Sequence, residues 1–161
     1  MSDDLTLRPA RREELHAVAA LAAKLVRQHH GFDPQRFFVP DRVEEGYAWW
    51  FGKEIDREEV VLLVAVRGDA IAGYAYGRLE ERDWNQLLDA CGALHDLWVE
   101  EPERRHGVAS RLVEAAVAAL VARGAPRVVL HTAAPNAAAQ ALFARLGFRK
   151  TMVEMTREAS G

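Results

Sequence analysis

The sequence predicts an α/β domain built on a mixed β-sheet. Apolar residues recur at helical spacing in two segments, 15–26 and 108–121, and strand-like apolar runs lie before and after each segment. The run 128–130 follows the second segment closely enough to form a β-α-β crossover, which makes two strands parallel. A tight turn at Arg67-Gly68-Asp69 joins two further runs as an antiparallel hairpin, so the predicted sheet contains both kinds of pairing.

Three strands and two helices are predicted in the N-terminal half of the chain. Leu5 to Arg8 is the first strand, and the helix after it is expected to stop at Gly31, because glycine tolerates the left-handed conformation of a C′ residue. The other elements are a helix from about Arg42 to Glu54, strands from Val60 to Val66 and from Ile71 to Leu79, and a polar loop from Glu80 to Asp89.

The C-terminal half is predicted to alternate strands and helices. Gly124 and Pro126 end its first helix, and Gly147 ends its second. The elements are a strand from Ala93 to Val99, a helix from Gly107 to about Arg123, an interior strand from Val128 to Leu130, a helix from about Asn136 to Leu146, and a last strand from roughly Phe148 to Thr156.

The composition fits one compact domain. The chain has 161 residues, of which 50% are hydrophobic and 28% are charged, so it can bury a sizeable core. The N-terminus Met-Ser-Asp-Asp is acidic, unlike a secretory signal, and no apolar run reaches the roughly 20 residues of a membrane span. Cys91 is the only cysteine, which excludes an internal disulfide and a cysteine-rich zinc site. We therefore expect a cytoplasmic protein without a membrane partner.

The charge distribution favours a small anionic ligand over a large one. The net charge of −3 argues against a nucleic-acid partner, but Arg104, Arg105, His106 and Arg111 form a local basic cluster that an anionic cofactor could use. No metal site is predicted. His29 and His30 are adjacent, so they diverge on a helix, and no acidic or cysteine partner stands at ligand spacing.

A phosphate-binding motif lies where the strand from Ala93 to Val99 leads into the next helix. A turn containing Pro102 is followed by Arg104-x-x-Gly107-x-Ala109, in which the two small residues leave room beside the backbone. The first turn of a helix has unpaired N–H groups at the positive end of the helix dipole, so it attracts a pyrophosphate. The chain contains neither of the other common phosphate loops, Gly-x-x-x-x-Gly-Lys-Ser/Thr or Gly-x-Gly-x-x-Gly.

A second motif supports a family resemblance. The segment Asn136-x-x-Ala139-x-x-Leu142-Phe143-x-x-x-Gly147-Phe148 and the motif at Arg104 together resemble the two acetyl-CoA motifs of the GNAT superfamily, the acetyl-CoA-dependent N-acetyltransferases. Leu7-Arg8-Pro9-Ala10 is similar to the usual opening of that family. The resemblance implies a single GNAT-like domain over 1–161, with a mixed central sheet of six to seven strands flanked by about four helices. It also implies acetyl-CoA as cosubstrate and no metal.

The resemblance assigns the cofactor-binding residues. The backbone from Arg105 to Ser110 would cradle the pyrophosphate, and Asn136, Ala139 and Phe143 lie on one helical face that would meet the pantetheine. The alternative for the first motif is an ordinary helix start beside solvated arginines. The assigned residues are Leu97, Trp98, Val99, Arg104, Arg105, His106, Gly107, Val108, Ala109, Ser110, Asn136, Ala139 and Phe143.

The family stabilises the oxyanion with a backbone N–H near the end of the fourth strand, which corresponds here to Leu97, Trp98 and Val99. Such a donor contributes a few kcal/mol to lowering a barrier in a dry site, about 10²–10³ in rate. The assignment of these three residues rests on the resemblance, because a main-chain contact leaves no trace in residue type.

Proton removal is the step for which side chains matter, since an amine with a pKa of about 10.4 is protonated at neutral pH. His95 is the first candidate base, because Leu94-His95-Asp96-Leu97-Trp98-Val99 resembles the strand that supplies the base in polyamine-type and arylalkylamine-type members, and because histidine titrates near neutral pH. Glu100 is the second candidate and Asp96 the third. Strand alternation predicts that His95 and Asp96 face opposite sides of the sheet. A structural alternative for His95 is a hydrogen bond to a backbone carbonyl.

Phe143 departs from the family pattern. The family usually has a tyrosine at this position to protonate the leaving thiolate, and phenylalanine has no proton to give. CoA thiolate would then leave unprotonated or take its proton from water, or Tyr74, Tyr76 or a residue of the segment 32–56 would replace the missing acid. The Trp49-Trp50-Phe51 cluster of that segment is interpreted as core packing rather than as an aromatic substrate cage.

The sequence therefore predicts an N-acetyltransferase that transfers the acetyl group of acetyl-CoA to a primary amine by direct attack. The acceptor is expected to be a small molecule or a peptide, and the acidic residues of the segment 32–56 suit a cationic one. The alternative is a non-catalytic module that binds acetyl-CoA or CoA, which the loss of tyrosine at Phe143 motivates. A homodimer is possible, as in the resembling family.

Overall fold

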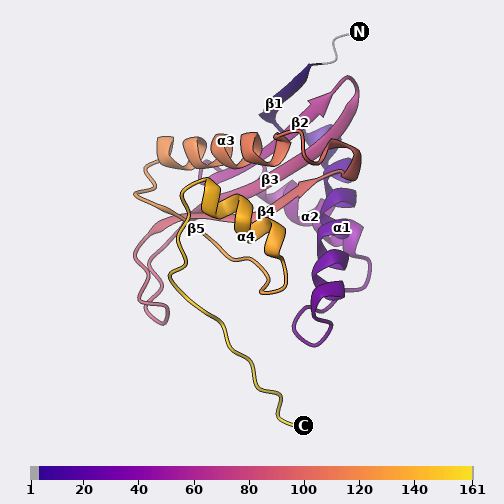
Figure 1. The fold of residues 1–161 in the computed structure, drawn as a ribbon. Coiled ribbons are helices and arrows are strands. Elements are labelled where there is room, and N and C mark those ends of the chain that lie inside the picture. The colour runs from indigo at the N-terminus through magenta and orange to yellow at the C-terminus, as the bar shows by residue number, and fades with distance from the viewer. Residues whose placement is uncertain (1–3, 161) are drawn as a thin grey trace.

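The structure is a computed structural model that describes residues 4–160, so residues 1–3 of the acidic N-terminus lie outside the described residues. One β-sheet forms its centre, with α3 and α4 on one face and α1 and α2 on the other (Figure 1). The elements are β1 Leu5–Pro9, a 3-10 turn Arg12–Glu14, α1 Leu15–Phe32, α2 Val43–Glu54, β2 Val60–Arg67, β3 Ala70–Glu80, β4 Cys91–Val99, a 3-10 turn Glu101–Glu103, α3 Val108–Ala122, β5 Val128–Leu130 and α4 Ala137–Arg145.

The strands lie in the sheet in chain order. β1, β2, β3 and β4 pair antiparallel in succession, and β5 pairs parallel to β4 through the crossover helix α3. The prediction that Val128 to Leu130 is an interior strand is wrong, because β5 lies at the edge of the sheet and is only half-buried. The predictions of a mixed sheet and four helices are confirmed. The prediction of six to seven strands is wrong, because the sheet of the described residues has five strands.

The missing strand is the one predicted from Phe148 to Thr156. This segment runs away from the fold as an extended chain without strand pairing (Figure 1). On one side of such a strand Lys150 and Glu154 would alternate with Met152, so only the side with Val153 and Met155 would be apolar. Met152 is accordingly 70% exposed, and Glu154 instead forms an ion pair with Arg36.

The helix α1 also differs from the prediction at its end. It continues through Gly31 to Phe32, and Asp33 is its C-cap residue. The ring of Phe32 lies 6.1 Å from that of His29 one turn earlier, which extends the packed face of the helix past the glycine. Gly31 therefore lies inside the last turn rather than after it.

β2 divides the interior into two cores because its side chains alternate between the two faces. Val61, Leu63 and Ala65 face α3, whereas Val60, Leu62 and Val64 face α1 and α2. All of these side chains are buried, which explains why the sequence of β2 is a continuous apolar run rather than an alternation of apolar and polar residues.

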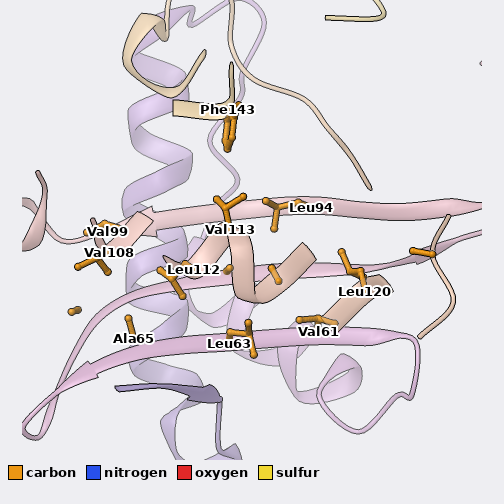
Figure 2. Close-up of a cluster of buried hydrophobic side chains, with 14 residues drawn as sticks. Val61, Leu63, Ala65, Leu94, Val99, Val108, Leu112, Val113, Leu120 and Phe143 are labelled. Atoms are coloured by element: carbon orange, nitrogen blue, oxygen red, sulfur yellow. The ribbon is translucent and has the colours of Figure 1, made fainter. Parts of the chain in front are cut away.

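The α3 core is almost entirely aliphatic, as Figure 2 shows. Leu112, Ala116 and Leu120 of α3 are fully buried against the sheet. Phe143 projects from α4 toward Val113 and Leu94 and is the only aromatic residue among the buried members of this core that the structure describes.

The α1/α2 core includes aromatic and charged side chains. Phe51 of α2 packs against the rings of Tyr74 and Tyr76, with centroid distances of 6.0 and 5.4 Å. Glu54 is buried at the edge of this core, where its carboxylate accepts hydrogen bonds from Arg78 and from the Tyr76 hydroxyl, both at 3.2 Å. This face of the sheet therefore contains polar groups that the α3 face lacks.

Candidate functional site

The two parallel strands separate before β4 ends. β4 pairs with β5 only from Gly92 to Leu94, whereas on its other edge it stays paired with β3 as far as Val99. β5 ends at Leu130, so the edge of β4 that includes Leu97, Trp98 and Val99 has no β5 neighbour. Main-chain polar groups on such an edge can bind a ligand in place of a strand, except the Val99 carbonyl, which accepts a hydrogen bond from Arg104.

The phosphate cradle, residues Arg105 to Ser110, follows directly. Gly107 is the N-cap residue of α3 with φ at +76°, and the non-glycine Arg105 also has a positive φ of +67°. The first-turn N–H groups of Val108, Ala109 and Ser110 have no acceptor within the helix, and no acidic side chain occupies that turn. A Cβ added at Gly107 would meet nothing within 4 Å, so the space beside the cradle is open. This geometry suits an anion.

The basic residues of the motif are used in two ways. Arg104 donates from Nε to the Val99 carbonyl at 3.0 Å and lies 4.8 Å above the Trp98 ring. It therefore ties the turn to the end of β4. Arg105 and His106 are exposed beside the cradle, where they can meet an anionic ligand.

The second motif forms the start of α4. Asn136 is the N-cap residue, and its Oδ1 accepts a hydrogen bond from the Ala139 N–H at 3.1 Å. Its side-chain carbonyl thus caps the helix, which leaves the amide group for a ligand. Phe143 is buried with its ring 5.8 Å from that of Phe148, so it contributes packing to the α3 core.

A pocket of about 340 Å³ opens on the opposite face of the sheet, between α2 and the strands β3 and β4. We call it the α2 pocket. Its lining residues are Pro40, Asp41, Arg42, Val43, Gly46, Tyr47, Trp50, Tyr76 and Asp96. Asp96 lies on β4 just after Leu94, the last residue that pairs with β5. The α2 pocket therefore reaches the same stretch of β4 that β5 leaves uncovered.

Asp96 has an unusual environment for a carboxylate. The hydroxyl of the buried Tyr74 donates to its Oδ2 at 3.0 Å. Burial raises the pKa of Asp96 to about 6, although the Tyr74 hydrogen bond and the charges of His95 and His29 act in the opposite direction. A carboxyl group with such a pKa can accept and release protons near neutral pH.

His95 lies at an irregularity in the pairing of β3 with β4, where the register shifts between Tyr76 and Gly77. Its side chain is exposed, its Nε2 is 2.8 Å from the Glu80 carboxylate, and its ring stacks on Tyr76 at 5.7 Å. It is not among the residues that line the α2 pocket. The structural alternative for His95 was a hydrogen bond to a backbone carbonyl. The structure shows a hydrogen bond to the Glu80 side chain instead.

Glu100 follows β4 and belongs to an ion pair. Its carboxylate accepts from Lys24 at 2.6 Å and from the Trp98 indole at 3.3 Å. Burial opposes ionisation, but the hydrogen bonds from Lys24 and Trp98, with the charges of Lys24 and Arg104, outweigh it and lower the pKa of Glu100. A carboxylate held in its ionised form in this way is a weak base.

The three aromatic residues Trp49, Trp50 and Phe51 of α2 lie in three different environments. Phe51 is core, as interpreted from the sequence, but Trp50 lines the α2 pocket and Trp49 is 62% exposed, with Lys53 4.2 Å above its ring. Sequence reasoning missed Tyr47, Trp50 and Tyr76 as neighbours of Asp96. The aromatic content of the segment 32–56 was the available signal, because the i, i+3 spacing of Tyr47 and Trp50 puts both on one helical face.

Tyr74 and Tyr76, considered as replacements for the missing acid, are both engaged with carboxylates. Tyr74 donates to Asp96 and Tyr76 to Glu54. Burial raises the pKa of Tyr76 to about 12, while that of Tyr74 is well above its usual range.

Between residues 4 and 160 no group of three or more His, Cys, Asp or Glu residues could hold a metal ion, and no helix is long and apolar enough to cross a bilayer.

Comparison with known proteins identifies the family. The profile of the Acetyltransferase (GNAT) family matches residues 22–148, which include both sequence motifs. No curated protein has a sequence that matches this chain.

Solved structures share the fold at low sequence identity. An aminoglycoside N-acetyltransferase in complex with CoA has a TM-score of 0.80 at 16% identity, covering 100% of this chain and 98% of that one. A predicted acetyltransferase with acetyl-CoA from Clostridium acetobutylicum has a TM-score of 0.75 at 13% identity, with coverages of 95% and 96%. Glucosamine-6-phosphate N-acetyltransferase from Arabidopsis thaliana has a TM-score of 0.69 at 14% identity, with coverages of 98% and 99%.

Proposed function

This chain belongs to the acetyltransferase (GNAT) family, and we propose that it transfers the acetyl group of acetyl-CoA to a primary amine by direct attack, without a covalent enzyme intermediate. One observation carries the proposal: Asp96 lies in the α2 pocket and also on the stretch of β4 that β5 leaves uncovered. An amine in the pocket and a thioester beside the uncovered edge would thus meet at the same strand.

The residues of the chain fit acetyl-CoA. The phosphate cradle offers first-turn N–H groups, open space at Gly107 and the exposed side chains of Arg105 and His106. The edge of β4 from Leu97 to Val99 offers peptide groups to the pantetheine and to the oxyanion. When bound, acetyl-CoA supplies an acetyl group that is activated as a thioester.

Asp96 is the group we assign to proton removal. The bound ammonium first loses one proton to water, because only the neutral amine has a lone pair that can attack the thioester. As the C–N bond forms, the attacking nitrogen becomes acidic and its second proton passes to the Asp96 carboxylate, whose pKa of about 6 leaves it ionised above neutral pH. The C–S bond then breaks, and the CoA thiolate takes its proton from water because Phe143 has none to give. The roles of His95 and Glu100 as bases remain predictions. His95 is exposed and hydrogen-bonded to the Glu80 carboxylate, and Glu100 forms an ion pair with Lys24.

We also propose that the chain forms a homodimer through its C-terminal segment. Met152, Val153 and Met155 are 70%, 78% and 90% exposed in this segment, and a partner chain would remove these apolar side chains from water. Light scattering distinguishes the two states: a truncation after Lys150, which keeps Phe148 packed on Phe143, should convert a dimer to a monomer, and a full-length monomer would contradict the proposal.

The test of the activity measures release of free CoA thiol from acetyl-CoA across polyamines, aminoglycosides, amino acids, arylalkylamines and lysine peptides. CoA affinity is measured by calorimetry on the same sample. Amine-dependent thiol release is the expected result. Tight CoA binding without release for any amine would favour a non-catalytic CoA-binding module, and no CoA binding would contradict both functions.

A further inference from the structure

Three of the nine residues that line the α2 pocket are aromatic. Tyr47, Trp50 and Tyr76 line it together with the apolar side chains of Pro40 and Val43. Its volume of about 340 Å³ is at the small end of the range for ligand sites. A pocket of this size can enclose an amine with one or two rings, whereas an oligosaccharide would remain largely outside.

Most acidic residues near the pocket are already paired. The segment 32–56 suggested a cationic site from its sequence, yet its carboxylates neutralise arginines of the same chain. The pairs are Glu44 with Arg27, Glu45 with Arg42, Glu54 with Arg78, and Asp56 with Arg12. Asp41 and Asp96 are the carboxylates among the lining residues, and Asp41 lies on the exposed turn beside Arg42. One carboxylate, Asp96, therefore stands at the inner end of the pocket.

The phenols of the pocket add no further negative charge. Burial, followed by the charges of Asp96 and Tyr76, raises the pKa of Tyr47 to about 12, and burial likewise raises that of Tyr76 to about 12. Both are therefore neutral at physiological pH. These aromatic side chains and that of Trp50 can cover an apolar body, whereas a second ammonium group among them would lose its hydration without a buried carboxylate as partner.

We propose that the α2 pocket selects a primary amine that carries one positive charge on a compact apolar body, such as an arylalkylamine, over polycationic acceptors. The ammonium group pairs with Asp96, and the ring packs between Tyr47, Trp50 and Tyr76. This inference rests on the proposed acetyl transfer for its meaning, but it concerns equilibrium binding and can be tested without turnover.

The test uses Gly46, which lines the pocket and has nothing within 4 Å of an added Cβ. Phenethylamine and spermidine are titrated separately into the protein by calorimetry, first without and then with saturating CoA. Phenethylamine should bind about 10-fold or more tightly than spermidine, because its ring is removed from water. Gly46→Leu should weaken the binding of phenethylamine by a factor of about 10, and the smaller substitution Gly46→Ala should weaken it by less. Neither variant should alter CoA affinity.

Each other outcome is decisive. Spermidine binding as tightly as phenethylamine, no binding of either amine, or phenethylamine binding that Gly46→Leu leaves unchanged would overturn the inference. Phenethylamine binding in the expected order without release of CoA thiol would leave the pocket assignment standing and would overturn the acetyl transfer instead.

Discussion

On the α3 face of the sheet the core is almost entirely aliphatic and the cradle is made of main chain, whereas on the α2 face the core also includes three buried aromatic residues and the pocket is made of side chains. The cradle comes from one short segment, residues 105–110, whose backbone conformation depends on Gly107. The α2 pocket combines residues 40–50 with Tyr76 and Asp96 from two separate strands. A main-chain cradle suits a cofactor that all members of a family bind, whereas a pocket of side chains suits a particular acceptor.

This difference has an energetic counterpart. Main-chain donors and a helix dipole bind an anion without any buried charge, so the cradle costs little stability. The α2 face instead holds Glu54 and Asp96 among apolar side chains, and each must be compensated by a hydrogen bond or an ion pair. If the proposed sites are right, stability and function are coupled on the α2 face and largely separate on the α3 face.

The largest effect is expected at the cradle. Gly107→Asp places a negative charge beside the phosphates, and like charges about 4 Å apart at an effective dielectric of about 20 repel by about 4 kcal/mol, or about 10³ in CoA affinity. Gly107→Asn is the matched control, since it has the same shape and tolerates the same positive φ. Calorimetry should show a far smaller loss of CoA affinity for Gly107→Asn than for Gly107→Asp. Equal losses of CoA affinity in the two variants would mean that charge is irrelevant at this position.

The α3 core should give the next effect, on stability alone. Leu112→Ala removes a fully buried side chain of α3 and should lower the free energy of unfolding by about 3 kcal/mol. Val121→Ala on the same helix is the control, because Val121 is 53% exposed and should change stability by less than about 0.5 kcal/mol. Urea denaturation measures both. A small effect at Leu112 would show that this core is not close-packed.

On the α2 face, removing the buried charge of Asp96 should increase stability. The pKa of Asp96 is raised from 3.8 to about 6 in the folded protein, so the folded state binds more protons between these values and stability falls as pH rises through that window. Asp96→Asn should therefore raise the free energy of unfolding by about 1–2 kcal/mol at pH 8 and have little effect near pH 3.5. Urea denaturation at both pH values checks this. A variant less stable than the native protein at pH 8 would contradict the assigned environment.

The smallest effect is expected outside both faces. Arg36 and Glu154 form an ion pair with side chains 45% and 61% exposed, and exposed pairs contribute less than about 1 kcal/mol. Arg36→Ala should leave both the unfolding midpoint and CoA affinity almost unchanged. A loss above 2 kcal/mol, by the same reasoning, would show that the C-terminal segment is part of the folded core.

The cradle and the pocket also differ in how far the sequence predicts them. Gly107 and Asn136 belong to short motifs whose spacing fixes local backbone geometry, so the start of α3 and the cap of α4 could be predicted. The α2 pocket could not be predicted, because nothing in the local sequence indicates that Tyr47 of α2 and Asp96 of β4 line the same pocket. The strand predicted from Phe148 to Thr156 failed for a related reason: its β-branched and apolar residues suggested a strand, but nothing local indicates whether a neighbouring strand lies within reach to pair with it.

The measurement that tests the account most directly is the pH–rate profile of CoA thiol release for the native protein and for Asp96→Asn, with His95→Ala as the comparison. If Asp96 accepts the proton, the native rate falls below a pH of about 6, Asp96→Asn is slower by about 10²–10⁴ without loss of CoA affinity, and His95→Ala keeps the native profile. A native profile in Asp96→Asn, with the loss appearing in His95→Ala, would assign the proton to the exposed histidine and contradict the account.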